Sequence, residues 1–186
     1  MSSRGKLVVI SGPSGAGKST IAAEVVKRTG AEFSISATTR PPRPAEVDGR
    51  DYRFVEGKAF DKMVEAGQFL EWAEVFGYMY GTPAAPVQKA LAEGKTVVLD
   101  VDVQGGKQVH DKMPSATFVL VVPPSPEELA RRLGRRGTEQ DAQLRRRLAK
   151  ADEEVHAAQA CGVYNHVVVN DDLEQAIRQV VQIVQR

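Results

Sequence analysis

The 186-residue sequence has little of several residue types, and each shortage excludes a class of protein. Cys161 is the only cysteine, so no disulfide can form within the chain. Its position near the end of a predicted helix favours a small packing residue over a catalytic thiol. The three histidines are scattered, without the spacing of a metal site. The net charge is +1, so no overall field favours nucleic acid or a membrane surface.

Long apolar runs are also missing. No stretch approaches the roughly 18 consecutive apolar residues of a membrane-spanning helix, so we expect no membrane span. Residues 1–6 lead into the first predicted strand without the apolar segment and cleavage site of a signal peptide. With 42% hydrophobic and 26% charged residues, the composition fits one globular unit, and we expect it in the cytoplasm.

The most informative segment is a glycine-rich stretch, residues 12–19, that fits the P-loop pattern G-x-x-x-x-G-K-[ST]. An apolar strand pattern at 7–10 precedes it and a helical pattern at 20–28 follows it, which argues against a glycine-rich loop without a ligand. In a P-loop, backbone N–H groups bind nucleotide phosphates, the lysine reaches the β- and γ-phosphates, and the Ser19 hydroxyl can ligate Mg²⁺. The predicted phosphate-binding residues are Gly12, Pro13, Ser14, Gly15, Ala16, Gly17, Lys18, Ser19 and Thr20.

The outer parts of the chain alternate strands with helices. Apolar strands are predicted at 96–100, 117–122 and 166–169, and helices at 20–28, 142–160 and after Asp171 or Asp172. This alternation predicts an α/β fold, with a parallel sheet and helices on both of its faces. Five residues form the predicted apolar stripe of the last helix: Leu173, Ile177, Val180, Val181 and Val184.

The middle of the chain follows a different pattern. Residues 33–36 are predicted as a strand, and residues 36–86 combine short alternating segments with short helices, which predicts a mostly antiparallel insert. We therefore expect a core of residues 1–35 and 87–186, and a separate insert of residues 36–86. The arginine-rich segment near 135–147 is predicted as a lid on the core.

Two further features point to phosphate chemistry. Asp100 ends the strand at 96–100, and a carboxylate at that position beside a P-loop is typical of a Walker B acid. The Pro-rich segment 38–51 is predicted as a loop held by what it binds. It carries Arg40 and Arg43, and Tyr52 follows it; guanidinium forks and a phenol suit a phosphate. Two loop arginines could also be solvated surface, but the P-loop favours the phosphate interpretation.

Together these motifs resemble the guanylate kinase family. The matching segments run in order over nearly the whole chain: 12–19, 36–43, 49–55, 69–72, 80–82, 99–105, 136–139 and 169–173. The resemblance implies a P-loop nucleoside monophosphate kinase fold, with a small GMP-binding insert and a helical lid. It also implies Mg²⁺-dependent transfer of the γ-phosphate of ATP to GMP or dGMP, giving ADP and GDP.

The resemblance implies a GMP site at ten positions. The two arginines and two tyrosines would hold the phosphate, and Glu71 would accept hydrogen bonds from guanine N1 and the 2-amino group. Adenine lacks the N1–H, and a buried polar group left unpaired costs about 1–3 kcal/mol, so a carboxylate there would discriminate. A surface acid in an alternating strand is the alternative interpretation of Glu71. The positions are Ser36, Arg40, Arg43, Tyr52, Glu71, Tyr80, Gly81, Thr82, Asp100 and Asp102.

On the ATP side, the resemblance places Asn170 near the adenine and assigns lid arginines to the phosphates. The implied catalytic residues are Lys18, Arg40, Arg43, Arg136 and Arg147. The arginine-rich segment could instead be a solvated face or a nucleic-acid patch, but balanced charge and missing aromatic residues argue against nucleic acid. Residues 131–147 hold seven arginines in all, and of these Arg132 and Arg145 are expected to be plain surface.

Two rival functions follow from the same residues. One is a non-catalytic guanylate-kinase-like binding module, which the intact Lys18 and Ser19 argue against. The other is a P-loop kinase for another acceptor, which Ser36, Glu71 and Thr82 argue against. The expected partners are ATP and GMP, without nucleic acid or membrane, and both a monomer and a homo-oligomer are compatible with the sequence.

Overall fold

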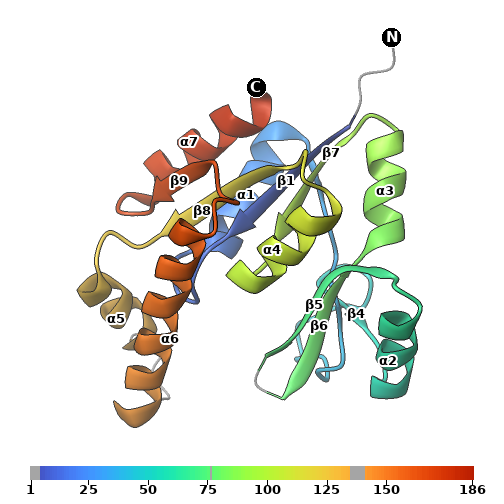
Figure 1. Cartoon of the computed structure of the whole chain (residues 1–186), viewed down its shortest axis with the longest axis horizontal. Helices are drawn as coiled ribbons and strands as arrows, with labels where there is room; N and C mark the ends of the chain where they lie inside the picture. The colour runs from blue at the N-terminus through green and yellow to red at the C-terminus, as the bar shows by residue number, and fades with distance from the viewer. Residues whose placement is uncertain (1–4, 76, 135–140) are drawn as a thin grey trace.

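The computed structural model describes residues 5–75, 77–134 and 141–186, without the side chains of residues 141–147 and 150 (Figure 1). Its main sheet has five strands in the order β2-β7-β1-β8-β9. Each pair of neighbours runs parallel, so the predicted parallel sheet is confirmed. The strands are β1 (Lys6–Ser11), β2 (Glu32–Phe33), β7 (Thr96–Asp100), β8 (Thr117–Val122) and β9 (His166–Val169).

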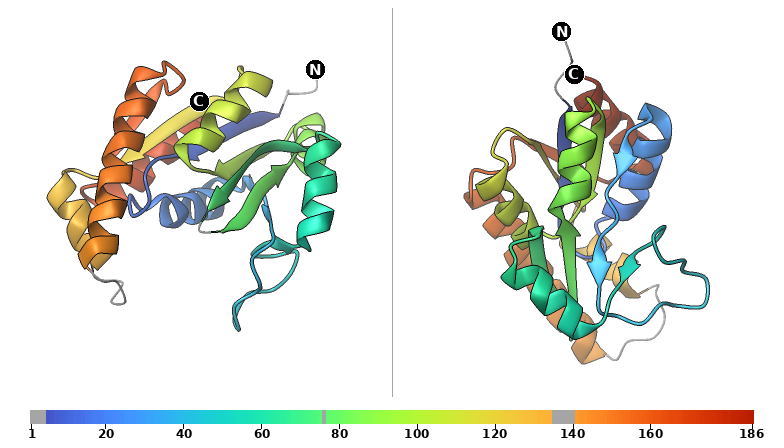
Figure 2. Two further views of the ribbon diagram at one scale, coloured as in Figure 1. Left: turned by 60° about the horizontal axis from the view of Figure 1, so that its bottom comes forward. Right: turned by 90° about the vertical axis from the view of Figure 1, so that its right-hand side faces the viewer.

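Helices cover both faces of this sheet (Figure 2). On one face, apolar residues of β1 and β8 pack against α1 (Lys18–Thr29) and α7 (Leu173–Gln185). On the other face the sheet packs against α3 (Ala84–Ala92), α4 (Val103–Lys112) and α6 (Asp141–Ala160). Because the central strands are buried on both faces, their sequences are continuous apolar runs and not alternating ones.

The helix α4 is absent from the sequence prediction. Gly105 and Gly106 lie in its first turn, and glycine costs about 1 kcal/mol relative to alanine within a helix. The helix forms because Val103 and Val109 are buried against the sheet and because Asp102 caps its first turn. The Asp102 carboxylate accepts a hydrogen bond of 2.7 Å from the backbone N–H of Gly105.

The last helix shows a second difference. Leu173 is 41% exposed and does not belong to the apolar stripe, so that part of the prediction is wrong. It occupies the first position of α7, before the helix reaches the sheet, and Ala176 is buried in its place. Asp172 is the N-cap and accepts a hydrogen bond of 2.7 Å from Gln175. This settles the choice between Asp171 and Asp172.

A second, four-stranded sheet in the order β4-β3-β6-β5 is built from residues 37–83. Its β3–β6 and β5–β6 pairs are antiparallel and its β3–β4 pair is parallel. Residues 34–36 connect β2 to β3, so the strand predicted at 33–36 is wrong beyond Phe33. The elements are β3 (Ala37–Thr38), β4 (Arg53–Phe54), β5 (Phe69–Val75), β6 (Tyr78–Pro83) and α2 (Gly57–Glu65).

The small sheet and the pair formed by α5 (Pro126–Gly134) and α6 extend past the same edge of the main sheet (Figure 1). Phe60 of α2 stacks on Phe69 of β5, with 4.6 Å between ring centroids, in the small sheet's own core. Leu129 and Leu133 of α5 pack against α6. Within the described residues, no helix is long and apolar enough to cross a membrane.

Candidate active site

The P-loop lies between β1 and α1, at the edge of the sheet where the parallel strands end. Gly12 has a φ of 147°, and a Cβ built on it would stand 2.0 Å from the carbonyl oxygen of Val121. Gly17 has a φ of 93°, and a Cβ there would stand 2.4 Å from the amide nitrogen of Asn170. Both positions therefore require glycine. The first turn of α1 contains no acidic residue, which suits a site for an anion.

Three side chains meet at this loop. The Lys18 ammonium donates a hydrogen bond of 3.0 Å to the Pro13 carbonyl, so the lysine lies over the loop. The Ser19 hydroxyl donates a hydrogen bond of 2.6 Å to the Asp100 carboxylate, which ends β7. Burial raises the pKa of Asp100, while the Lys18 charge and the Ser19 hydrogen bond oppose that shift. An ammonium, a hydroxyl and a carboxylate thus lie beside the N–H groups that would bind phosphate.

Asn170 supports the loop from the end of β9. Its side-chain amide donates a hydrogen bond of 2.7 Å to the Ala16 carbonyl, and its backbone N–H donates to Val122 at 2.8 Å. The side-chain oxygen of Asn170 is buried and has no hydrogen-bond partner within the described part of the chain. Asn170 therefore fixes the P-loop backbone, a contact that the sequence did not indicate.

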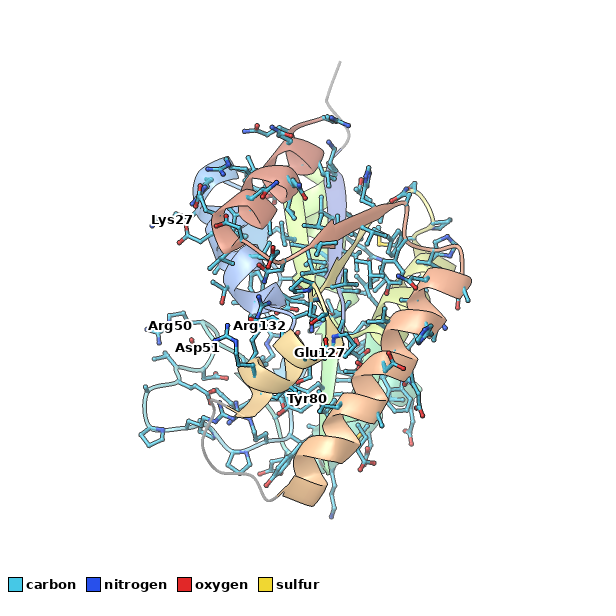
Figure 3. All side chains as sticks on the ribbon, turned by 90° about the vertical axis from the view of Figure 1, so that its left-hand side faces the viewer. Lys27, Arg50, Asp51, Tyr80, Glu127 and Arg132 are labelled. Carbon is cyan, nitrogen blue, oxygen red and sulfur yellow. The ribbon has the colours of Figure 1, made fainter. Side chains whose placement is uncertain are left out.

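Arg132 of α5 reaches the same residue. It lies between α5 and the first turns of α1 (Figure 3) and donates a hydrogen bond of 2.8 Å to the Asn170 carbonyl. Its Nε donates to Glu128 at 2.7 Å, and its side chain is only 23% exposed. The prediction that Arg132 is plain surface is wrong, because it ties α5 to the P-loop support. Arg136 lies outside the described residues, as do the side chains of Arg145 and Arg147.

The small sheet gathers a second group of side chains around Arg40. Its guanidinium donates hydrogen bonds of 2.8 and 2.9 Å to the two oxygens of Glu46, and its Nε donates at 3.2 Å to the Tyr80 hydroxyl. The guanidinium carbon lies 5.4 Å from the ring centroid of Tyr52, whose own centroid is 6.0 Å from that of Tyr80. Arg40, Tyr52 and Tyr80 are therefore together, and the Arg43 side chain is exposed on the same loop.

Glu46 is a residue that sequence reasoning missed. Its carboxylate also accepts a hydrogen bond of 2.8 Å from the backbone N–H of Arg43, and Arg40 and Glu46 are 13% and 16% exposed. The hydrogen bonds from Arg40 and Arg43 lower the pKa of Glu46. The loop at 38–51 therefore has internal hydrogen bonds of its own, which the prediction of a loop held by what it binds did not include. The sequence signal for this ion pair was no more than the presence of an acid three residues after Arg43.

Glu71 is buried, so its interpretation as a surface acid is wrong. Its carboxylate accepts a hydrogen bond of 2.6 Å from the Thr82 hydroxyl across the β5–β6 hairpin. Burial raises the pKa of Glu71 to about 7, and the charge of Asp102 adds to this, against the opposing Thr82 hydrogen bond and Lys112 charge. A buried carboxylate can bind hydrogen-bond donors of a ligand closely. A ligand that places an acceptor against it leaves both groups without a hydrogen bond, which is strongly unfavourable.

The remaining predicted positions lie around this carboxylate and the P-loop. Ser36 directly precedes Ala37, which is paired with Gly81, next to Thr82. Asp100 and Asp102 diverge: the first carboxylate bonds Ser19 of α1, and the second caps α4. The structure therefore gathers two groups of predicted residues, one around the P-loop and one on the small sheet.

A P-loop at the carboxyl edge of a parallel sheet, next to a second sheet with arginines and a buried acid, defines a P-loop kinase fold. A gluconokinase from Sinorhizobium meliloti 1021 shares this fold, with a TM-score of 0.52 and 18% identity over 98% of this chain and 93% of that chain. The chain belongs to the guanylate kinase family, whose model matches residues 4–186.

Individual relatives agree with the family match. A guanylate kinase of Nocardia farcinica is 50% identical over 183 residues, which is 97% of this chain and 93% of the relative. A guanylate kinase of Thermus thermophilus is 47% identical over 94% of this chain and 78% of its own length. The crystal structure of guanylate kinase from Anaplasma phagocytophilum has a TM-score of 0.78 and 31% identity, covering 98% of this chain and 86% of that chain.

Proposed function

We propose that this chain transfers the γ-phosphate of ATP to GMP or dGMP, giving ADP and GDP or dGDP. The observation that carries the proposal is the buried Glu71 carboxylate, hydrogen-bonded to Thr82 on the small sheet of a P-loop kinase fold. The names of the relatives support the same activity.

For the base, guanine offers two adjacent donors, N1–H and the 2-amino group, which one ionised carboxylate can accept together. The Thr82 hydrogen bond orients the Glu71 carboxylate, and Ser36 and Gly81 border the same position. Adenine would set a lone pair at N1 against the carboxylate, and this mismatch disfavours AMP.

For the acceptor phosphate, Arg40, Arg43, Tyr52 and Tyr80 are the proposed binding residues. Arg40 donates to Tyr80 and Glu46, which fixes the plane of its guanidinium before any phosphate binds. Arg43 is exposed on the same Pro-rich loop, where its side chain can reorient toward a phosphate. Guanidinium groups bind phosphate through charge-assisted hydrogen bonds, so the loop suits the acceptor phosphate of GMP.

For the donor, residues 12–20 would bind the ATP phosphates, with Lys18 on the β- and γ-phosphates and Asn170 toward the adenine. Arg136 and Arg147, from the lid near 135–147, would neutralise the transferring group. The GMP phosphate attacks the γ-phosphorus in line and ADP leaves. No covalent enzyme intermediate is needed, because positioning and charge neutralisation can supply most of the rate.

Mg²⁺ is the proposed cofactor, and the donor set at Ser19 fits it. The Ser19 hydroxyl lies 2.6 Å from the Asp100 carboxylate, and these hard oxygen ligands are the kind that Mg²⁺ prefers. No cluster of three or more His, Cys, Asp or Glu residues that could hold a metal is found in the described part of the chain. This agrees with an ion held partly by substrate phosphates, whose charge it would neutralise when bound.

The division of the chain into a core (1–35 and 87–186), an insert (36–86) and a lid is likewise a proposal. It is supported by the small sheet, whose strands pair with one another. A cytoplasmic location remains a prediction from the sequence.

An assay of ADP release over GMP, dGMP, AMP, CMP and UMP tests the proposed function. We expect turnover with GMP and dGMP, and kcat/KM for AMP lower by at least about 100-fold, since an unpaired buried acceptor is strongly penalised. A preference for another acceptor would contradict the proposal.

A further inference from the structure

The helix α4 is hydrogen-bonded along β5, the strand that carries Glu71. We propose that Gln108 and Lys112 of α4 are positioning residues that set the place of the Glu71 carboxylate, and so contribute to the selection of guanine. The proposal rests on the proposed function, because it assigns to α4 a part in the base recognition attributed to Glu71.

The first observation is that strand β5 lies at one edge of the small sheet and exposes backbone hydrogen-bonding groups there. It is the last strand in the order β4-β3-β6-β5, so among the residues that the structure describes no strand lies along one side of its backbone. Its pairing with β6 is irregular between Phe69 and Glu71. Such an irregularity re-aims side chains, so the direction of Glu71 depends on how the strand is held there.

The second observation is that α4 supplies the missing partners on both sides of Glu71. The Gln108 side-chain amide accepts a hydrogen bond of 3.1 Å from the Trp72 N–H and donates one of 2.9 Å to the Trp72 carbonyl. This amide thus replaces the donor and acceptor of a neighbouring strand. The Lys112 ammonium donates a hydrogen bond of 2.7 Å to the Phe69 carbonyl. The backbone is therefore anchored one residue after Glu71 and two residues before it.

The third observation is that the same face of α4 makes room for the carboxylate. Gly105, Gln108 and Lys112 are spaced by three and four residues, which places them on one helix face. A Cβ built on Gly105 would stand 2.8 Å from Oε2 of Glu71 and 3.2 Å from Cβ of Val101. The glycine lowers helix propensity, but it lets Glu71 lie directly against the helix.

The fourth observation connects this helix to the P-loop. The helix α4 begins after Asp102, two residues beyond Asp100, which accepts the hydrogen bond from Ser19 of α1. Val103 and Val109 are buried, so α4 is packed firmly on the main sheet. The anchors at Gln108 and Lys112 therefore fix the base-recognition group relative to the phosphate-binding loop, and not only within its own sheet.

The test compares Gln108→Met, which keeps the side-chain length and removes both hydrogen bonds, with Gln104→Met at an exposed position of the same helix. For Gln108→Met we expect the KM for GMP to rise by about tenfold and the GMP:AMP ratio of kcat/KM to fall. This size of effect is expected because the variant loses two hydrogen bonds, which water replaces in part. The KM for ATP should stay within about twofold in both variants. Equal changes in both KM values would mean a general loss of structure and would overturn the proposal.

A second variant keeps the test independent of how Gln108→Met folds. Lys112→Met should also raise the KM for GMP selectively, while Lys112→Arg, which retains a cationic donor for Phe69, should restore most of the wild-type value. If Lys112→Met leaves the KM for GMP unchanged, the anchoring role of Lys112 is wrong.

A double-mutant cycle with Glu71→Gln separates this proposal from the proposed function. If Gln108 acts through Glu71, the effect of Gln108→Met on the GMP:AMP ratio should largely disappear in the Glu71→Gln background. Fully additive effects would overturn the positioning role and leave base recognition by Glu71 intact. An unchanged GMP:AMP ratio in Glu71→Gln alone would overturn base recognition by Glu71 and this proposal with it.

Discussion

The P-loop and the small sheet build their sites in different ways. The P-loop itself is one continuous segment, in which the backbone, with three glycines at positive φ, forms the proposed phosphate-binding surface. The small sheet instead uses side-chain pairs across turns and strands, Arg40 with Glu46 and Glu71 with Thr82. The comparison predicts that the donor site holds phosphates mainly through backbone groups, whereas selection of the acceptor depends on a few buried side chains.

The first test removes Lys18, the side chain that would act on the transferring phosphate at the proposed donor site. Lys18→Met should lower kcat by about three orders of magnitude, because a preorganised cation at the transferring phosphate is lost. The unfolding midpoint should stay close to that of the wild type, since the Lys18 ammonium lies over the P-loop at the Pro13 carbonyl and not in the core.

Lys27→Met is the matched control for this measurement. Lys27 lies on the same helix, its side chain is 77% exposed, and Figure 3 shows it pointing away from the site. It should keep the wild-type turnover. Near-normal turnover in Lys18→Met would contradict phosphoryl transfer at the P-loop.

The second test breaks the acceptor site and leaves the donor site intact. Arg40→Ala and Arg43→Ala should each weaken GMP binding by about 10- to 100-fold, since hydrogen bonds to charged groups contribute about 1.5–3 kcal/mol. Calorimetry with GMP and ATP separately should show unchanged ATP affinity.

Arg50→Ala is the control for the loop arginines. Arg50 is 65% exposed and pairs with its neighbour Asp51, so its removal should change neither affinity (Figure 3). Weaker ATP binding with unchanged GMP binding in the Arg40 or Arg43 variant would mean that the two sites are assigned the wrong way round.

The third test uses pH to sharpen the comparison. Because the pKa of Glu71 is raised to about 7, and only the ionised carboxylate accepts both guanine donors, GMP binding should weaken as pH falls below 7. The expected change is about tenfold per pH unit, the limit for one titrating group. The pH dependence of the KM for GMP in Glu71→Gln measures the part of the change that comes from titration of the GMP phosphate itself. Identical profiles in the two proteins would contradict the role of Glu71 ionisation.

Local patterns in the sequence predicted the parts of the fold that depend on neighbouring residues. The strand, loop and helix around residues 12–19, the apolar strands and the strand-helix alternation are all confirmed. Helix α4 was missed because Gly105 and Gly106 lower its local propensity, while its stability comes from burial of Val103 and Val109 against the sheet. Local propensity could not reveal this packing.

The contacts that complete the site depend on residues far apart in the sequence. Asn170 and Ala16 are separated by 154 positions, and Gln108 and Trp72 by 36. Alternation in β5 could not say which side of the strand is buried, so the burial of Glu71 became clear only from the hairpin and α4 together. Glu46 lies in a loop without periodicity, where no pattern predicts its pairing with Arg40.

The measurement that tests the central claim most directly is the GMP:AMP ratio of kcat/KM in the wild type and in Glu71→Gln. The glutamine keeps the shape, but its NH₂ must face a guanine donor, so GMP efficiency should fall by at least about 100-fold and AMP should gain relative to GMP. Glu74→Gln, at an exposed position of the same strand, should leave the ratio unchanged. A ratio in Glu71→Gln equal to that of the wild type would contradict the claim that this buried carboxylate selects guanine.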